Sequence, residues 1–195
     1  MKVIFLDHDG VICLSNNWGN RFKKQKDWGG RKLSMTTLEM PVEYRFDNFD
    51  EKAVKVLNEI LEETGAEIVV SSDWKRWANV QEMGEYYESK GIIKKPIAFT
   101  DSILYDDYND FPWHRLWDLE QTRSLEIAQY LGQNPNITHW VAIDDLNMSL
   151  KKEGEKEWGL KNFVLTPLNN QGIKQTGIKE KVLEFLTKKP YEKTI

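Results

Sequence analysis

Two carboxylates stand directly after the first apolar run of this chain. Residues 2–6 read Lys-Val-Ile-Phe-Leu, and Asp7, His8, Asp9 and Gly10 follow them. A short apolar run bounded by a glycine is typical of a buried strand. Side chains on a strand alternate between its two faces, so Asp7 and Asp9 would project together from the strand's carboxyl end. Two carboxylates this close repel each other unless a cation or a shared proton compensates, which indicates a hard-metal site, an acid/base pair, or both.

Apolar strands alternate with amphipathic helices along the rest of the chain. The spacing predicts helices at 50–64, 75–89, 122–131 and 177–188, and strands at 67–70, 97–100, 139–143 and 162–166. Asp50 and Gly65 are suited to begin and end the first of these helices, and Gly132 to end the third. The alternation favours a three-layer, Rossmann-like α/β fold, in which a parallel sheet has helices on both faces. We expect one domain over residues 1–195, with small cap-like insertions at about 14–48 and 101–121.

The composition restricts the partners that such a chain can have. The net charge is −4 over 195 residues, which gives no overall attraction to nucleic acid or to anionic membranes. The single cysteine, Cys13, allows no intrachain disulfide and no cysteine-based zinc site, and we expect it to be a small buried apolar residue. No apolar stretch approaches the ~20 residues of a membrane span, and no signal peptide opens the sequence. We therefore expect a cytoplasmic protein with no membrane partner.

Oxygen-bearing side chains follow three of the predicted strands. Asp7 and Asp9 follow the first strand, Ser71, Ser72 and Asp73 follow the strand at 67–70, and Asp144 and Asp145 follow the strand at 139–143. Ligands bind at the carboxyl ends of the strands in open parallel sheets, so we expect these side chains to converge on one crevice. For Ser72 and Asp73 a structural interpretation is equally open, because serine and aspartate are common helix caps.

The order of these residues resembles the haloacid dehalogenase (HAD) superfamily. Its four motifs are matched by Asp7-His8-Asp9-Gly10-Val11, by Ser71, by Arg123 on a helix, and by Ile143-Asp144-Asp145. The segment from Ser71 to Trp74 further resembles HAD phosphatase domains that occur alone or in RNA-repair proteins, which often read Ser-Ser-x-Trp-Arg. Here Lys75 and Arg76 follow Trp74, and the long segment at 101–121 departs from the narrower pattern.

The resemblance implies a Mg²⁺-dependent phosphomonoester hydrolase that works through an aspartyl-phosphate. Asp7 would be the nucleophile, and Asp9 would protonate the leaving oxygen and then activate water. Mg²⁺ would be held by the Asp7 carboxylate, the Asp9 backbone carbonyl and Asp144, with Asp145 bound directly or in support. Ser71 would donate a hydrogen bond to a phosphoryl oxygen.

A cation is also implied, to neutralise the phosphorylated intermediate. Arg123 matches the motif, although it could instead be a solvated helix arginine, with Lys94 or Lys95 in the role. The residues expected to contact the substrate are Gly10, Ser72 and Trp74. His8 lies between the two aspartates and so faces the other side of the strand, which predicts a packed histidine.

Aromatic residues gather in or beside the two insertions. They are Trp18, Trp28, Trp74, Trp113 and Trp117, and the first two are accompanied by Arg21, Lys23, Lys24, Lys26, Arg31 and Lys32. These side chains could stack bases and hold a phosphate backbone, or they could pack the insertions onto the core. The acidic character of 101–121 argues against a continuous nucleic-acid groove.

We expect the partner to be a phosphorylated substrate, either a small molecule or a nucleic-acid end, such as a nucleotide or oligonucleotide phosphate. Two alternatives remain open. One is a HAD phosphotransferase, and the other is a non-catalytic RNA- or protein-binding module on a HAD scaffold.

Overall fold

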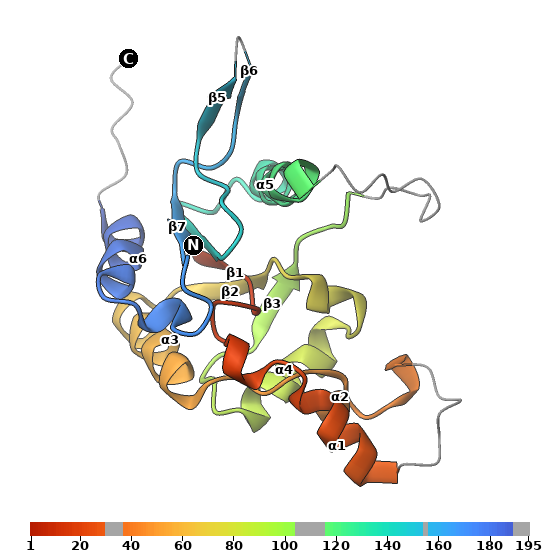
Figure 1. Ribbon diagram of the computed structural model, residues 1–195. Coiled ribbons are helices and arrows are strands. Elements are labelled where there is room, and N and C mark those ends of the chain that lie inside the picture. The colour runs from red at the N-terminus through yellow and green to blue at the C-terminus, as the bar shows by residue number, and fades with distance from the viewer. Residues whose placement is uncertain (30–36, 104–115, 154–155, 189–195) are drawn as a thin grey trace, which may run out of the picture.

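A five-stranded, all-parallel sheet forms the centre of the molecule (Figure 1). The structure is a computed structural model that describes residues 1–29, 37–103, 116–153 and 156–188. The strands of the sheet are β1 (Lys2–Leu6), β2 (Glu67–Val70), β3 (Pro96–Phe99), β4 (His139–Asp144) and β7 (Phe163–Leu165), in the order β3-β2-β1-β4-β7. The predicted three-layer α/β fold is confirmed, because helices cover both faces of this sheet.

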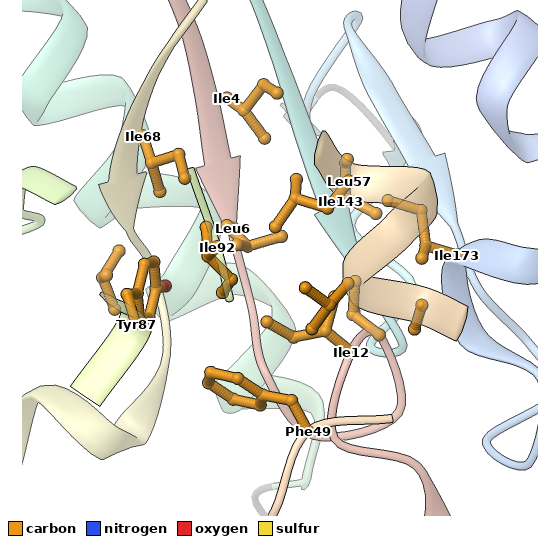
Figure 2. Close-up of a cluster of buried hydrophobic side chains, with 14 of the residues drawn as sticks. Ile4, Leu6, Ile12, Phe49, Leu57, Ile68, Tyr87, Ile92, Ile143 and Ile173 are labelled. Atoms are coloured by element: carbon orange, nitrogen blue, oxygen red, sulfur yellow. The ribbon is translucent and has the colours of Figure 1, made fainter. Parts of the chain in front are cut away.

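The alternation of side chains along β1 separates two hydrophobic clusters. Ile4 and Leu6 belong to the larger cluster, with side chains of α3 (Glu51–Thr64), α4 (Val80–Ser89) and α6 (Ile178–Thr187) (Figure 2). Val3 and Phe5 belong to the smaller cluster on the opposite face, which includes Ile127 of α5 (Leu116–Gln133). All four of these β1 side chains are fully buried. The first strand is thus apolar on both faces, as expected of a central strand in a parallel sheet.

Helix α3 begins and ends where its sequence predicts. The Asp50 carboxylate accepts a hydrogen bond from the Ala53 amide at 2.9 Å, which satisfies one of the free N–H groups of the first turn. Gly65 ends the helix with φ +67°, in the left-handed region that glycine adopts at little cost. Because β1 and β2 are parallel, the chain must return from the carboxyl end of β1 to the start of β2, and α3 is part of this connection.

Other predicted boundaries were wrong. The expected helix at 75–89 is two elements, a 3₁₀ turn η3 (Asp73–Arg76) and α4, because Asn79 and Glu82 form a capping box that starts α4 at Val80. Helix α5 begins at Leu116 rather than 122 and continues through Gly132, whose cost inside a helix is only about 1 kcal/mol.

One element was not anticipated from the sequence. A short antiparallel hairpin of β5 (Lys151–Glu153) and β6 (Lys156–Trp158) follows β4. Three-residue strands are too short to show a reliable period of two, which explains why the pattern was missed. No helix in the described part of the chain has both the length and the apolar character needed to span a membrane.

In the described parts of the predicted insertion at 14–48, residues 14–29 and 37–48, the elements are short helices. They are η1 (Ser15–Asn17), α1 (Asn20–Gly29), η2 (Thr37–Glu39) and α2 (Val42–Arg45). The Lys24 ammonium donates to the carbonyls of Glu43 and Phe46 at 2.8 and 2.6 Å, and the Trp28 ring stacks on Tyr44 at 5.1 Å. For Lys24 and Trp28, the structure thus favours the packing interpretation.

A buried arginine joins this insertion to the rest of the fold. Arg45 is 7% exposed and donates to the carbonyls of Met40 and Trp77 and to the Glu82 carboxylate at 2.7, 2.9 and 2.8 Å. Trp113 of the second predicted insertion lies outside the described residues, as do Arg31 and Lys32 of the first; of Trp117 only the backbone is described.

Candidate active site

The polar strand ends meet because backbone hydrogen bonds continue one residue past each strand. The Asp7 amide donates to the Ile143 carbonyl at 3.1 Å, and the Ser71 amide donates to the Leu6 carbonyl at 2.9 Å. Asp7 therefore lies between the ends of β4 and β2, its neighbours in the sheet. The predicted convergence at the carboxyl edge is present.

Three carboxylates come together at this edge. Within the described ranges, Asp7, Asp144 and Asp145 each place one oxygen within 4.8 Å of the others. Asp7 and Asp144 are 3% and 1% exposed. Burial raises the pKa of both carboxyls, and for Asp7 the nearby Asp144 raises the pKa further. Burial, followed by the charge of Asp144, raises the pKa of Asp145 to about 6.

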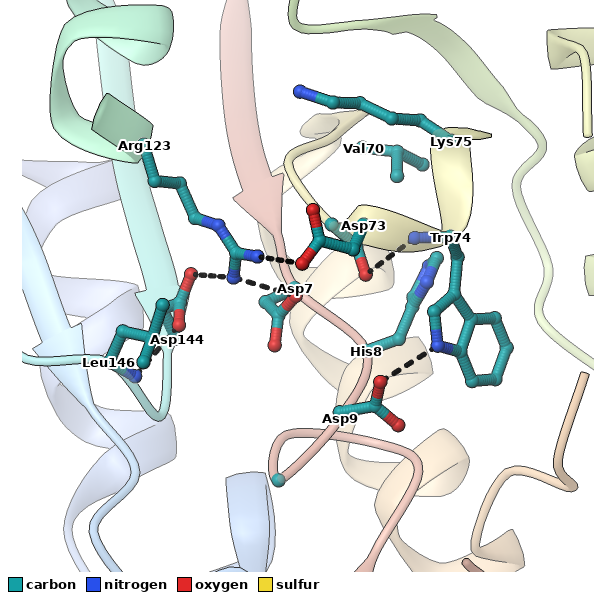
Figure 3. Close-up of polar contacts among 12 residues, drawn as sticks. Asp7, His8, Asp9, Val70, Asp73, Trp74, Lys75, Arg123, Asp144 and Leu146 are labelled. Carbon is teal, nitrogen blue, oxygen red and sulfur yellow. Dashed lines mark hydrogen bonds and ion pairs between the residues drawn. The ribbon is translucent and has the colours of Figure 1, made fainter. Parts of the chain in front are cut away.

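Arg123 is the cation that the structure brings to these carboxylates (Figure 3). Its Nη1 lies 3.0 Å from Asp7 Oδ1 and 2.8 Å from Asp144 Oδ2, and its Nη2 lies 3.6 Å from Asp73 Oδ2. The neighbouring carboxylates raise the pKa of this guanidinium despite its burial, so it stays charged. Of the two other candidates, Lys94 pairs with Glu67 at the start of β2, and Lys95 pairs with Glu88.

A tight loop after Asp7 brings Gly10 against Asp145. The His8 carbonyl accepts hydrogen bonds from the amides of Ile12 and Cys13 at 3.0 and 2.8 Å, which closes the loop. Gly10 has φ +68°, and a Cβ atom on it would lie 2.5 Å from Asp145 Oδ2. Only glycine fits here, so the predicted Gly10 contributes by its lack of a side chain.

The Asp9 carboxylate is not part of the Asp7–Asp144–Asp145 group and contacts Trp74 instead. Its Oδ2 accepts a hydrogen bond of 2.8 Å from Nε1 of Trp74, which is itself 4% exposed. Burial raises the pKa of Asp9, while the Trp74 bond acts in the opposite direction. Trp74, which the sequence predicts to contact the substrate, is thus almost fully buried and donates its indole N–H to Asp9.

The two serines after β2 are both buried but differ in their partners. Ser72 Oγ accepts a hydrogen bond from the Trp74 amide at 3.4 Å, so it caps η3. Ser71 is 2% exposed, and its Oγ has no hydrogen-bond partner among the described residues. A buried hydroxyl without a partner is costly, which makes Ser71 suited to an oxygen of a ligand.

His8 is a packed histidine, as its position on the strand predicts. It is fully buried, and its Nε2 lies 2.6 Å from the Tyr87 hydroxyl. Burial, with a smaller effect of Arg123, lowers the pKa of His8 to about 3. Cys13 is likewise buried, as expected.

Some polar residues near the site escaped the sequence analysis. Thr100 and Thr166 follow β3 and β7 and are both buried, and the strand-end criterion used for Asp7 would have found them. Thr166 Oγ1 donates to the Gly10 carbonyl at 3.1 Å. Lys75 pairs with Glu126 at 2.6 Å, but no local pattern signals a contact between residues so distant in sequence.

The three grouped carboxylates suit a hard divalent cation. They offer only oxygen ligands, which Mg²⁺ prefers. When all are ionised, three carboxylates beside one guanidinium leave two negative charges, and a bound cation would offset their repulsion. Asp7, Asp144 and Asp145 are therefore the residues that would hold such an ion.

Comparison with known protein families agrees with this geometry. Residues 3–177 match the family described as the HAD domain in Swiss Army Knife RNA repair proteins. The chain belongs to this family. The match covers both the Asp7 loop and the Asp144–Asp145 pair of this HAD domain, and it confirms the predicted resemblance. The searches of curated proteins and of solved structures gave no match.

Proposed function

We propose that this HAD domain is a Mg²⁺-dependent phosphomonoester hydrolase that forms a phosphoryl intermediate on Asp7. One observation carries the proposal: three strand-end carboxylates lie within 4.8 Å of one another, and Arg123 contacts two of them. Membership of the HAD family supports a phosphoesterase in general terms. A bound Mg²⁺ would supply positive charge that lets an anionic phosphate approach an anionic carboxylate.

In the first step, an Asp7 oxygen attacks phosphorus. The bond between phosphorus and the ester oxygen breaks, its electron pair stays on that oxygen, and Asp9 donates a proton to it. The products of this step are the free alcohol and an aspartyl-phosphate. Arg123, 3.0 Å from Asp7, would neutralise charge on the transferred group, and the unpaired Ser71 hydroxyl would donate to one of its oxygens.

In the second step, water attacks the same phosphorus atom. Asp9, now ionised, takes a proton from this water as the bond between phosphorus and the Asp7 oxygen breaks. Inorganic phosphate leaves, and Asp7 and Asp9 return to their starting states. The raised pKa of buried Asp9 supports the first step, because an acid must hold a proton near neutral pH.

The proposed substrate class is a nucleotide or oligonucleotide phosphate. The family description names RNA repair proteins, which is the observation that favours a nucleic-acid end over other phosphate esters. The alternatives of phosphoryl transfer to another acceptor and of a non-catalytic binding module remain rival proposals.

A phosphoester panel with Mg²⁺ tests the proposed function. The panel includes 3′- and 5′-phosphorylated oligonucleotides, mononucleotides, an alkyl phosphate and p-nitrophenyl phosphate, and phosphate release is measured. Asp7→Asn should lose turnover by roughly 10⁴-fold or more, as expected when a covalent nucleophile is removed. Asp27→Asn, an exposed carboxylate on α1, is the matched control and should retain full activity.

Three outcomes would contradict the proposal. Retained activity in Asp7→Asn would exclude the covalent mechanism. Rates that depend on an added acceptor alcohol would favour a phosphotransferase. No release from any ester, together with tight RNA binding, would favour the binding module.

A further inference from the structure

We infer that Trp74 is a positioning residue for Asp9, and that its indole N–H fixes which carboxylate oxygen can serve the leaving group. This inference rests on the proposed function, since it concerns the proton step at Asp9. The contact itself is direct: Nε1 of Trp74 donates to Oδ2 of Asp9 at 2.8 Å (Figure 3). Trp74 is at the start of η3 and Asp9 is in the loop after β1, so two separate strand ends build the pair.

The chemistry of an indole makes this bond directional. An indole N–H can only donate, so Oδ2 of Asp9 must act as the acceptor. A proton held by Asp9 is therefore favoured on Oδ1, the oxygen that the indole does not contact. Trp74 thus leaves Oδ2 in a fixed hydrogen bond and Oδ1 available to exchange a proton with the substrate.

The surroundings of Trp74 hold the donor still. Its ring stacks on Phe46 at 4.5 Å with an interplanar angle of 6°, and on Phe49 at 5.4 Å with an angle of 11°. The His8 ring lies at 4.6 Å. With 4% of its surface exposed, the indole has no room to turn, so the hydrogen bond to Asp9 is formed before any substrate arrives.

The same bond explains why Asp9 is separate from the cation site. Among the described residues, the carboxylates within 4.8 Å of one another are those of Asp7, Asp144 and Asp145. Asp9 is two residues from Asp7, yet its carboxylate accepts the indole N–H of Trp74. The Trp74 hydrogen bond therefore separates the proposed roles of the two aspartates: Asp7 lies in the cation site, and Asp9 is available for proton transfer.

The decisive variant is Trp74→Phe, which keeps an aromatic ring in the stack and removes the N–H donor. Proton donation matters most when the leaving group is a poor one, so kcat/KM for an alkyl phosphate, which reports only the step that releases the alcohol, should fall by roughly tenfold or more, within the ~10²- to 10⁴-fold contribution of a general acid. With p-nitrophenyl phosphate, whose phenolate leaves without a proton, kcat/KM should change by less than about threefold.

Trp140→Phe is the matched control. Trp140 is on β4 with its ring against Phe5 in the other hydrophobic cluster, so this variant should lower neither rate. Equal losses on both esters in Trp74→Phe, or no loss on the alkyl ester, would overturn the inference. Such a result with an inactive Asp7→Asn would leave the proposed function standing, whereas a wild-type protein without phosphatase activity would remove the proposed function itself.

A spectroscopic measurement tests the contact even if Trp74→Phe fails to fold. In protein labelled with ¹⁵N-tryptophan, one indole N–H signal should be shifted downfield and protected from exchange with solvent. In Asp9→Ala, that signal should move upfield and lose protection, while Asp27→Ala should leave it unchanged. An unchanged indole spectrum in Asp9→Ala would overturn the inference.

Discussion

At the scale of single residues, two features of the Asp7–Gly10 loop have measurable consequences for stability. One is the buried neutral His8, and the other is the left-handed Gly10 pressed against Asp145. His8 directly follows the proposed nucleophile Asp7, and Gly10 is three residues after it in the same loop. Their effects on folding can therefore be measured beside their effects on catalysis.

His8 should make the protein less stable in acid. Its pKa is about 3 in the folded state and 6.5 when unfolded, so between these values the unfolded chain binds more protons. The stabilising contribution is complete above pH 6.5 and is lost as pH falls toward 3, by at most about 1.4 kcal/mol per pH unit. We expect urea unfolding from pH 7 to 4 to show a steeper loss of stability for wild type than for His8→Gln. If the stability of wild type and of His8→Gln depended on pH in the same way, the lowered pKa of His8 would be contradicted.

Gly10→Ala should cost more than an ordinary glycine replacement. The left-handed conformation at φ +68° costs an alanine about 1–2 kcal/mol, and the new Cβ would lie 2.5 Å from Asp145 Oδ2. Gly91→Ala is the matched control, since Gly91 has φ +78° and a Cβ atom added there would meet no other part of the chain within 4 Å. Chemical denaturation should therefore show the larger loss for Gly10→Ala, with weaker Mg²⁺ binding by calorimetry. Equal losses of stability for the two variants would mean that the loop shifts enough to relieve the contact between the new Cβ atom and Asp145.

At the scale of elements, two ion pairs hold α5 over the carboxyl edge of the sheet. Helix α5 supplies the cation of one pair and the anion of the other. Arg123 contacts Asp73 of η3 at 3.6 Å, and Glu126, one turn later, contacts Lys75 of η3 at 2.6 Å. The Lys75 ammonium also donates to Thr100 Oγ1 at 3.0 Å, at the end of β3. Helix α5 is thus joined to the ends of two strands, which fixes where Arg123 lies.

Breaking the Lys75–Glu126 pair should destabilise the fold and misplace Arg123. The two side chains are 7% and 10% exposed, and loss of one partner from a buried pair costs about 3–5 kcal/mol. We expect a loss of that size in Lys75→Met, with a fall in phosphatase kcat. The exposed pair Lys95–Glu88 is the control, and Lys95→Met should cost less than about 1 kcal/mol.

A double-mutant cycle measures the interaction energy between Lys75 and Glu126 separately from their other contacts. Lys75→Met with Glu126→Met should recover part of the stability lost in the single variants, because no unpaired charge then stays buried. Additive losses would show that the two residues stabilise the fold independently.

At the scale of the whole molecule, the candidate cation site exists only when the sheet is formed. Asp7 and Asp144 are 137 positions apart in sequence, and they meet because β1 and β4 are neighbours. An unfolded chain has no such arrangement of oxygens. Binding of a cation should therefore be linked to folding.

Mg²⁺ should raise the melting temperature of the protein. A ligand that binds only the folded state at 100 times its dissociation constant adds about 2.7 kcal/mol of stability. Thermal unfolding with MgCl₂, compared with KCl at equal ionic strength, should show this increase for wild type and a much smaller one for Asp145→Asn. Equal effects of the two salts would argue against a specific site.

Local patterns in the sequence were enough to predict the strands of the sheet, to within about one residue, and the order of the site residues along the chain. Strand periodicity and chain direction are local properties, so the convergence of Asp7, Ser71 and Asp144 could be predicted, and so could the ends of α3. Helix starts were less certain, because the capping box at Asn79 and the early start of α5 depend on competition between neighbouring turns.

The contacts between distant side chains could not be predicted from the sequence and follow from the packing of the folded chain. The bonds from Trp74 to Asp9, from Lys75 to Glu126 and from Thr166 to the Gly10 carbonyl join residues 65, 51 and 156 positions apart. Contacts of this kind depend on how helices and loops pack against the sheet, and no periodic pattern in the sequence predicts them. Contacts of the same kind place Arg123, and not Lys94, beside Asp7, since Lys94 lies beside Glu67 at the opposite end of β2.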